Sequence, residues 1–170
     1  MAMKEKMLKT LNEQINKEIY SAYLYLSMSA YLMSKNLPGF ANYMRVQYQE
    51  EMSHAMKLYD YLLERGEKVV LKEIAAVKTE WEDVIDIFED TLKHEEFITD
   101  SINNVLGVEH DVRDYATINM LQWYVNEQVE EEAHVSGVLE QLKMIDGKGS
   151  GLFMLDREMQ NRVFVDSTQA

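Results

Sequence analysis

The sequence predicts an all-α protein: a four-helix bundle with one long crossover connection and a short fifth helix. Its 170 residues include only seven Gly and one Pro, which favours long helices over a sheet with many turns. Apolar residues recur at alternating steps of three and four, the period of a helix buried along one face. The length suits one domain with a substantial core. We assign residues 1–162 to that domain and 163–170 to a C-terminal tail.

The first two helices are expected over about residues 4–34 and 38–65. Pro38 and Gly39 separate them, because Pro restricts the residue before it and Gly suits a turn. The second helix ends at Arg65, where a Gly follows a basic residue. The inward positions of the first helix are Leu8, Leu11, Ile15, Glu18, Ala22, Tyr25, Ser29 and Leu32. Those of the second are Phe40, Met44, Gln47, Glu51, His54, Leu58 and Tyr61.

A third helix is expected over residues 81–107 and a fourth over 111–145, separated by a short break that begins at Gly107. Thr79 and Glu82 fit a capping box at the start of the third helix. The inward positions of the third helix are Phe88, Leu92, Glu95, Thr99, Ile102 and Leu106. Those of the fourth are Thr117, Leu121, Tyr124, Gln128, Glu131, Val135, Val138, Leu142 and Ile145.

The lengths of the connections predict the topology. The first and third connections are short, so each joins two antiparallel helices. The middle connection has about 14 residues and, when extended, reaches the roughly 45 Å length of a 30-residue helix. The second and third helices can therefore run parallel. A Gly-rich hinge precedes a fifth helix over about 151–161, and we expect the residues from Asp166 onward to be frayed.

Composition excludes several classes of function. The chain has no Cys, which excludes thiolate zinc sites, iron–sulfur clusters and rubredoxin-type iron. Its net charge of −13 argues against nucleic-acid binding and favours cations as small partners. No run approaches the roughly 18 apolar residues that span a membrane. The start has no apolar stretch typical of a signal peptide, so we expect a cytoplasmic protein.

Six inward positions carry polar or charged side chains instead of hydrocarbon. They are Glu18, Glu51, His54, Glu95, Gln128 and Glu131. The positions repeat after 77 residues, because Glu18 corresponds to Glu95, Glu51 to Gln128 and His54 to Glu131. We therefore expect the two hairpins to place these groups at matching depth. One such Glu alone would usually be solvated, but that does not explain six. Buried charges are costly unless paired or metal-bound, and carboxylate with imidazole suits iron. We predict a two-metal site.

The second half of the repeat contains a literal Glu-x-x-His motif that offers an alternative register. If Glu131 matched Glu51, its spacing from Glu95 would be 36 residues, whereas the spacing from Glu18 to Glu51 is 33. Glu131 would then lie nearly one helical turn away from the level of Glu51. His134 would also lie beside the inward seam. We therefore predict Gln128 and Glu131 as the inner pair, with His134 outside the main site.

Further acids flank the seam. Glu50 and Glu127 are equivalent in the repeat, and Glu130 is one turn from Glu127, which predicts a third and weaker cation site. Surface acids that serve solubility alone remain an equal alternative. Tyr25 lies two turns from Glu18 on the same stripe, where a buried phenol could donate an electron to iron or hold a bound oxygen species. We include Tyr25 in the catalytic set.

At these residues the sequence resembles a non-haem prokaryotic ferritin, over residues 1 to about 162. The resemblance is carried by LNEQINKEIYSAYLY at 11–25, QEEMSHA at 49–55, KHEE at 93–96 and LQWYVNEQVEEE at 121–132. It implies the ferritin-like fold and a homo-24-mer shell. It also implies a ferroxidase that oxidises Fe(II) to Fe(III) with O2 or H2O2 and stores ferric mineral inside the shell.

The resemblance further implies a di-iron centre with a third iron site and no haem. The residues that match the first iron site are Glu18, Glu51 and His54. Those that match the second are Glu51, Glu95 and Glu131, with Gln128 beside them. Those that match the third are Glu50, Glu127, Glu130 and the shared Glu131.

Two alternatives have other functions. A haem-containing bacterioferritin is suggested by Met52, which lies where that relative presents a haem ligand, although a Met there is also ordinary apolar packing. A soluble di-iron oxidase or oxygenase would share the metal ligands but need a substrate pocket beside them. A purely structural bundle leaves the six inward polar residues unexplained.

Overall fold

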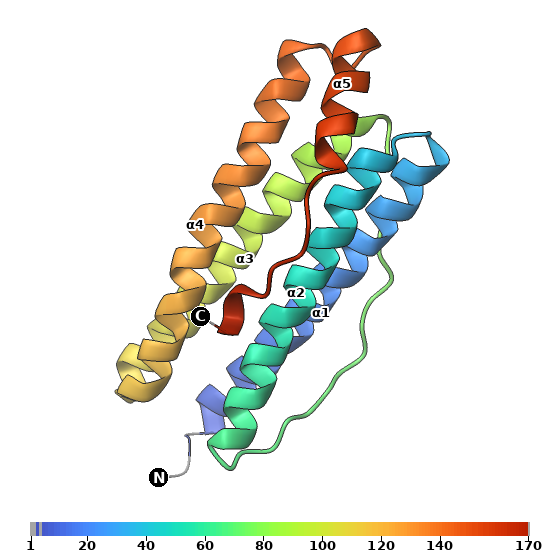
Figure 1. Ribbon diagram of the computed structural model, residues 1–170. Helices are drawn as coiled ribbons and strands as arrows, with labels where there is room; N and C mark the ends of the chain where they lie inside the picture. Colours follow the sequence, from blue (N-terminus) through green and yellow to red (C-terminus); the bar gives the residue numbers. More distant parts are fainter. Residues whose placement is uncertain (1–2, 4, 170) are drawn as a thin grey trace.

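The computed structural model describes residue 3 and residues 5–169, apart from the side chains of 109–112 and 169. It is all-α, as the sequence predicts (Figure 1). The elements are α1 (Glu5–Ser34), α2 (Pro38–Glu64), α3 (Val84–Val112), α4 (Tyr115–Met144), α5 (Gly149–Met159) and the 3-10 turn η1 (Ser167–Gln169). None of the helices in the described part of the chain combines the length and apolar character needed to cross a membrane.

The four long helices have the predicted topology. α1 and α2 form one antiparallel hairpin and α3 and α4 another, while residues 65–83 run along the outside of the bundle from the end of α2 to the start of α3 (Figure 1). α2 and α3 are therefore parallel. The first hairpin turns at Asn36, whose φ of 59° lies in the left-handed region that Asn tolerates.

The start of α3 differs from the prediction. Thr79 and Glu82 do not cap it, because the helix begins only at Val84. Asp83 caps it instead: its Oδ1 accepts a hydrogen bond from the backbone N–H of Asp86 at 2.9 Å. The Asp86 carboxylate in turn accepts from the N–H of Glu82 at 3.0 Å. A capping pair three residues apart is thus present, but it lies four residues further along the chain than predicted, and its second bond comes from the residue before the cap.

The predicted break at Gly107 is also wrong. α3 continues through this residue to Val112, and the chain turns at Arg113, which has a φ of 60°. Asp114 then caps α4 by accepting from the N–H of Thr117, and its carboxylate pairs with Arg65 at 2.8 Å. A Gly inside a helix costs only about 1 kcal/mol, and a well-packed helix absorbs that cost.

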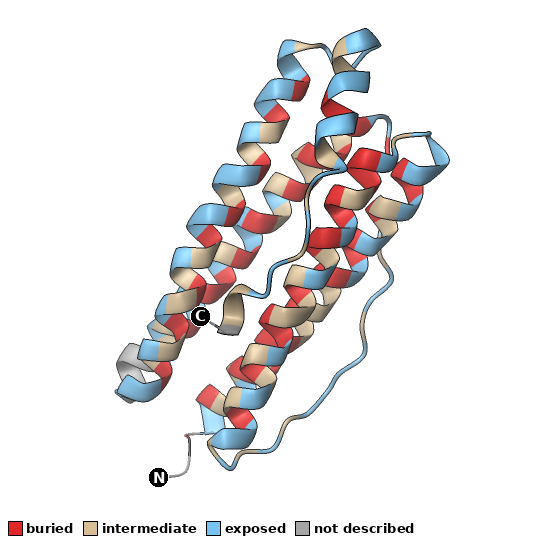
Figure 2. Cartoon of the chain, in the orientation of Figure 1, coloured by how far each residue is buried: buried red, intermediate tan, exposed pale blue. Residues whose placement is uncertain are grey.

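The buried apolar side chains form two clusters, one toward each end of the bundle. The cluster near α5 includes Phe40 and Phe88, and the one at the opposite end includes Leu58 and Leu121. The inward faces of the four helices are buried and their outward faces exposed (Figure 2). The polar inward residues lie between the two clusters, so the site is walled off at both ends by hydrocarbon.

The residues after α5 are held against the bundle. Residues 160–166 run back along α2 and α4 to η1 (Figure 1). Asn42 on α2 donates to the carbonyls of Met159 and Arg162, at 3.1 and 2.9 Å, and Lys57 donates to that of Thr168 at 3.1 Å. The expectation that the chain frays from Asp166 is therefore wrong for the described residues up to 169.

Candidate metal centre

All six predicted inward residues are buried at one level of the bundle. They come from all four long helices, and none has more than 4% of its surface exposed: Glu18, Glu51, His54, Glu95, Gln128 and Glu131. The 77-residue repeat therefore places the two halves at matching depth, as predicted. His134, by contrast, is exposed beside the seam.

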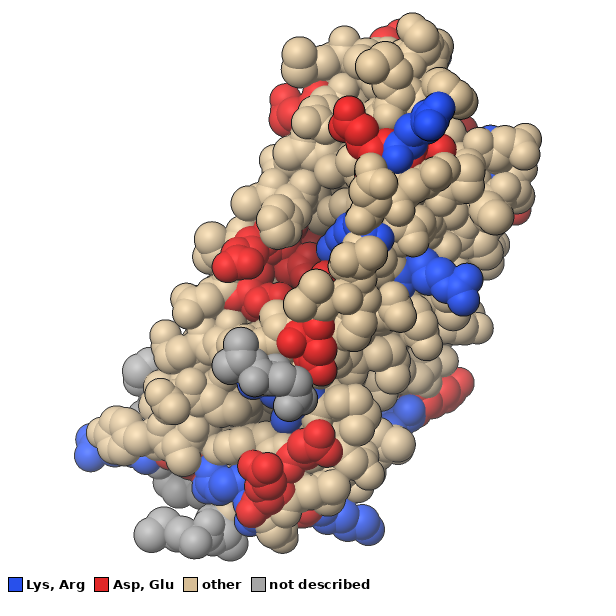
Figure 3. Space-filling model, viewed as in Figure 1, with Lys and Arg blue, Asp and Glu red and all other residues tan. Residues whose placement is uncertain are grey.

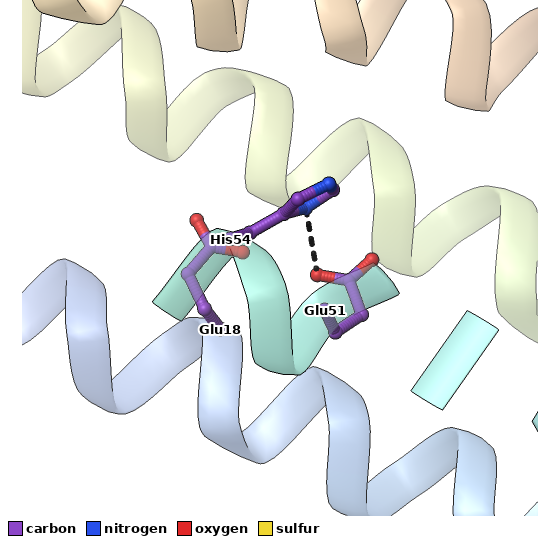
Figure 4. A group of neighbouring side chains, drawn as sticks. All are labelled: Glu18, Glu51 and His54. Carbon is purple, nitrogen blue, oxygen red and sulfur yellow. Dashed lines mark ion pairs between the residues drawn. The ribbon is translucent and has the colours of Figure 1, made fainter. Parts of the chain in front are cut away.

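The first half of the centre is a compact trio. Glu18 on α1 converges with Glu51 and His54 on α2, and one ligand atom from each lies within 4.8 Å of the other two (Figure 4). The Nδ1 of His54 lies 3.4 Å from a carboxylate oxygen of Glu51. Two carboxylates and one imidazole are a donor set that suits iron.

This trio is short of hydrogen-bond partners. Among the described residues, five buried side-chain N or O atoms have none, and four of them belong to the trio: Glu18 Oε2, both oxygens of Glu51, and Nε2 of His54. Leaving a buried polar atom unpaired costs about 1–3 kcal/mol, and more for a charged one. Such atoms at one point are explained most simply by a cation that they bind.

The second half of the centre is hydrogen-bonded within the protein. The Glu95 carboxylate accepts from the hydroxyl of Tyr25 and from Nε2 of Gln128, the latter at 3.1 Å. Glu131 accepts from Nε2 of Gln47 at 3.0 Å. Tyr25 thus touches a carboxylate of the centre directly.

A second group of potential ligands lies beside the trio. His54, Glu127 and Glu131 each offer an atom within 4.8 Å of the others, and His54 Nε2 lies 3.7 Å from Glu127 Oε1. Glu50 is next to this group but pairs with Arg162 at 2.6 Å. Glu130 is exposed and belongs to neither group, so the structure does not bring it to the outer acids as the sequence predicted.

Comparison with known proteins identifies the family. The chain matches the Ferritin family, described as a ferritin-like domain, over residues 8–145. This protein belongs to the ferritin family.

Prokaryotic ferritins, including bacterial non-haem ferritins, are among the relatives of this ferritin. It is 43% identical to the bacterial non-heme ferritin of Campylobacter jejuni over 161 residues, 94% of this chain and 95% of that protein. It is 36% identical to the non-heme ferritin of Staphylococcus saprophyticus, over 97% and 99% of the two chains. The solved open-pore ferritin of Archaeoglobus fulgidus superposes with a TM-score of 0.93 at 46% identity, covering 95% and 98% of the chains. The predicted non-haem type is thereby confirmed.

Burial sets the charge state of the centre in this ferritin. It raises the pKa of Glu18 and, together with the charge of Glu95, that of Glu51. It also raises the pKa of Glu95 to about 8. Burial alone would lower the pKa of His54, but the charge of Glu51 and the proximity of Glu127 raise it well above its usual value. Without a cation the centre therefore retains protons, which a metal ion must replace.

Two buried amides that support the centre were not predicted as site residues. Gln14 donates to Glu18 Oε1 at 2.8 Å. The side-chain oxygen of Gln14 accepts from the Ser101 hydroxyl at 2.6 Å, and that hydroxyl accepts from Lys17 at 2.6 Å. The chain of donors runs from a surface ammonium to a carboxylate of the trio. Gln47 supports Glu131 in the same way. The sequence features that could have identified them are the position of Gln14 one turn before Glu18 and the position of Gln47 on the inward stripe of α2.

Proposed function

We propose that this protein stores iron. It takes up Fe(II), oxidises it to Fe(III) at the buried centre with O2 or H2O2, and deposits ferric mineral inside a shell of 24 copies. The observation that carries the proposal is the trio of Glu18, Glu51 and His54, with four unpartnered ligand atoms in the core of the bundle. Membership of the non-haem ferritins supports the storage role and the shell.

Two iron ions bind in the inner layer. Glu18, Glu51 and His54 hold the first, and Glu51 bridges to the second. The second is held by Glu95 and Glu131, with Gln128 beside it as a neutral amide. An iron-edge anomalous map would contradict this register if the second strong peak lay within ligand distance of His134 while Gln128 and Glu131 faced away.

A third, weaker iron position lies outside this pair. Glu50, Glu127 and Glu131 are its ligands, and the closeness of Glu127 and Glu131 to His54 links it to the inner layer. Glu130 is also proposed for this position, and it has to move inward from its exposed place to contribute. An acidic approach concentrates cations near the entrance to a buried site.

The reaction follows from holding two Fe(II) ions together. Each gives up one electron, so the pair reduces one O2 to H2O2, or one H2O2 to two H2O, with the uptake of two protons in either case and without release of superoxide. Carboxylate oxygens favour Fe(III), the harder ion, over Fe(II). Tyr25 contacts Glu95 and is proposed either to supply one electron in place of an Fe(II) ion, when only one is bound, or to donate a hydrogen bond to the oxidant.

A soluble di-iron oxidase without a storage role is the second candidate. The feature that favours it is a groove of about 590 Å³ between α3 and α4, lined by Thr99 and Gln128 among others, which reaches the second half of the centre. The two candidates differ in assembly. Light scattering that finds only monomers or dimers at physiological salt contradicts the shell. At low salt, repulsion between chains of charge −13 weakens assembly, and screening restores it.

Aerobic addition of Fe(II) to the metal-free protein tests the activity. We expect rapid oxidation by the wild type, followed by retention of iron in particles of shell size. Glu51→Ala or His54→Ala should abolish rapid oxidation while the shell stays intact, and Glu96→Ala, an exposed neighbour of Glu95, should not. Removing one carboxylate from a buried acidic cluster relieves repulsion, so thermal stability should hold or rise. Oxidation at the wild-type rate by Glu51→Ala contradicts the assignment.

A further inference from the structure

An arginine from the C-terminal tail reaches the outer acids. Nη2 of Arg162 donates to Glu50 at 2.6 Å and also to the side-chain oxygen of Gln47. Nη1 donates to the carbonyl of Tyr43 at 3.3 Å, and the guanidinium lies 4.1 Å from the centre of the Tyr43 ring. The guanidinium is thus fixed by four contacts on α2.

The same guanidinium acts on a second carboxylate through Gln47. The Gln47 oxygen accepts from Arg162, and its Nε2 donates to Glu131 at 3.0 Å. Both hydrogen bonds point from the cation toward the carboxylate, so each polarises the other. Arg162 therefore stabilises negative charge on Glu50 directly and on Glu131 through one amide.

The rest of the tail completes the contact with the outer acids. Ser167 donates to Glu127 at 3.2 Å. Figure 3 shows acidic side chains gathered between α4 and the tail. The main chain of Arg162 is itself anchored, because Asn42 donates to its carbonyl at 2.9 Å. The guanidinium can consequently leave Glu50 without release of the turn that carries it.

We propose that Arg162 is the resident counter-cation of the outer metal site. In the metal-free protein its guanidinium binds Glu50, and a metal ion binds there by displacing it. This rests on the proposed function, which assigns iron to Glu50, Glu127 and Glu131. Arg162 lowers the affinity of the outer site and selects for ions of charge two or more, because a monovalent cation gains too little to replace a fixed guanidinium.

Zn²⁺ binding to the metal-free shell, measured by titration calorimetry, tests the proposal without redox chemistry. Arg162→Gln should tighten the weaker class of sites by about 3- to 10-fold, the range expected for loss of a partly buried competing ion pair. The tight class at Glu18, Glu51 and His54 should not change, because none of these residues bonds to Arg162 or Gln47 in the described hydrogen bonds. Arg162→Lys keeps the charge and should stay closer to wild type. The matched control is Lys57→Gln, which removes a basic side chain that contacts the tail at Thr168 but donates to no outer acid in the described hydrogen bonds.

Three outcomes overturn the proposal: unchanged or weaker outer-site affinity in Arg162→Gln, equal tightening in Lys57→Gln, or the same tightening when Glu50 is already Gln. The last comparison is a double-mutant cycle that isolates the Arg162–Glu50 contact. A wild type without a tight Zn²⁺ class that Glu51→Ala removes would instead refute the proposed function.

Hydrogen exchange on the wild type gives a test that needs no variant. Saturating Zn²⁺ should speed amide exchange in residues 163–169, because Ser167 loses its contact with Glu127 and the adjoining Arg162 side chain loses its contact with Glu50. The turn anchored by Asn42 should stay protected. Unchanged or slower exchange in the tail overturns the displacement of Arg162.

Discussion

Raising the pH from about 5 to about 8 is expected to destabilise the metal-free protein, because its centre holds carboxyl groups that ionise less readily when folded. A folded Glu95, with a pKa of about 8, keeps its proton over this range, whereas the unfolded chain, with a value near 4.5, has lost it. The folded state then binds more protons than the unfolded state, so the free energy of unfolding falls as the pH rises.

The size of the effect follows from Glu95, which has no exposed surface. Each pH unit between the two pKa values lowers the free energy of unfolding by about 1.4 kcal/mol, so three units amount to roughly 4 kcal/mol. For a chain of this length that corresponds to a fall in Tm of about 10 °C. Glu18 and Glu51 act in the same direction. His54 does too: its stabilising charge is fully present below its unfolded pKa and is lost as the pH rises through the raised folded value.

Calorimetry of chelator-treated protein from pH 5 to pH 8 at constant ionic strength measures this slope. Glu95→Gln should flatten it, and Glu96→Gln on the exposed side of the same helix should not. The dependence of Tm on pH is compared, and not Tm itself, because Gln128 donates to Glu95. A Gln at position 95 changes that hydrogen bond and therefore the absolute Tm. Bound Zn²⁺ should reverse the trend, since ligands shed protons to bind metal. A metal-free Tm that rises with pH, or an unchanged slope in Glu95→Gln, refutes the reasoning.

Two further substitutions test a hydrogen bond that supports the centre and the packing of α5 against α2. Gln14→Leu removes the hydrogen bond to Glu18 and should weaken Zn²⁺ binding at the trio by about 10- to 100-fold in calorimetric titration. Ser101→Ala leaves that hydrogen bond in place and should cause a smaller loss of affinity. Gly39→Ala would place a Cβ 1.5 Å from the carbonyl oxygen of Asp156, so α5 must shift and Tm should fall by roughly 5–10 °C. Gly137→Ala meets nothing within 4 Å in α4, and an unchanged or slightly raised Tm is expected; an equal fall in both Gly variants would rule out the contact with α5 as the cause.

The fold could be predicted because the helices are long and their apolar stripes are sustained. Periodicity over about thirty residues fixes which face of a helix is inward, and connection length then fixes the topology. The helix ends were less predictable. A Gly such as Gly107 is typical of a helix break, yet the helix continues through it and the chain turns only at Arg113. The packing of a long helix outweighs the cost of one Gly.

The burial of the six inward polar residues was predictable for the same reason, since they lie on those stripes. The 77-residue repeat separates Gln128 and Glu131 from His134, and the structure buries the first two and exposes the third, while their roles toward a metal stay a prediction. The tail was not predictable. Arg162 lies in a segment with no periodicity, more than 100 residues from Glu50, so nothing in the sequence brings the two together.

The two halves of the centre are prepared differently for a cation, although the repeat puts them at one depth. Where the first half has Glu51, the second has Gln128, whose amide donates to Glu95. That single difference turns a repulsion between carboxylates into a hydrogen bond. Glu95 is therefore satisfied within the protein, and Gln47 satisfies Glu131 separately, while Glu18, Glu51 and His54 keep ligand atoms without a hydrogen-bond partner. A cation at the trio would relieve an existing cost, whereas one at the second half would first have to break hydrogen bonds. We therefore predict that the trio has the greater intrinsic affinity.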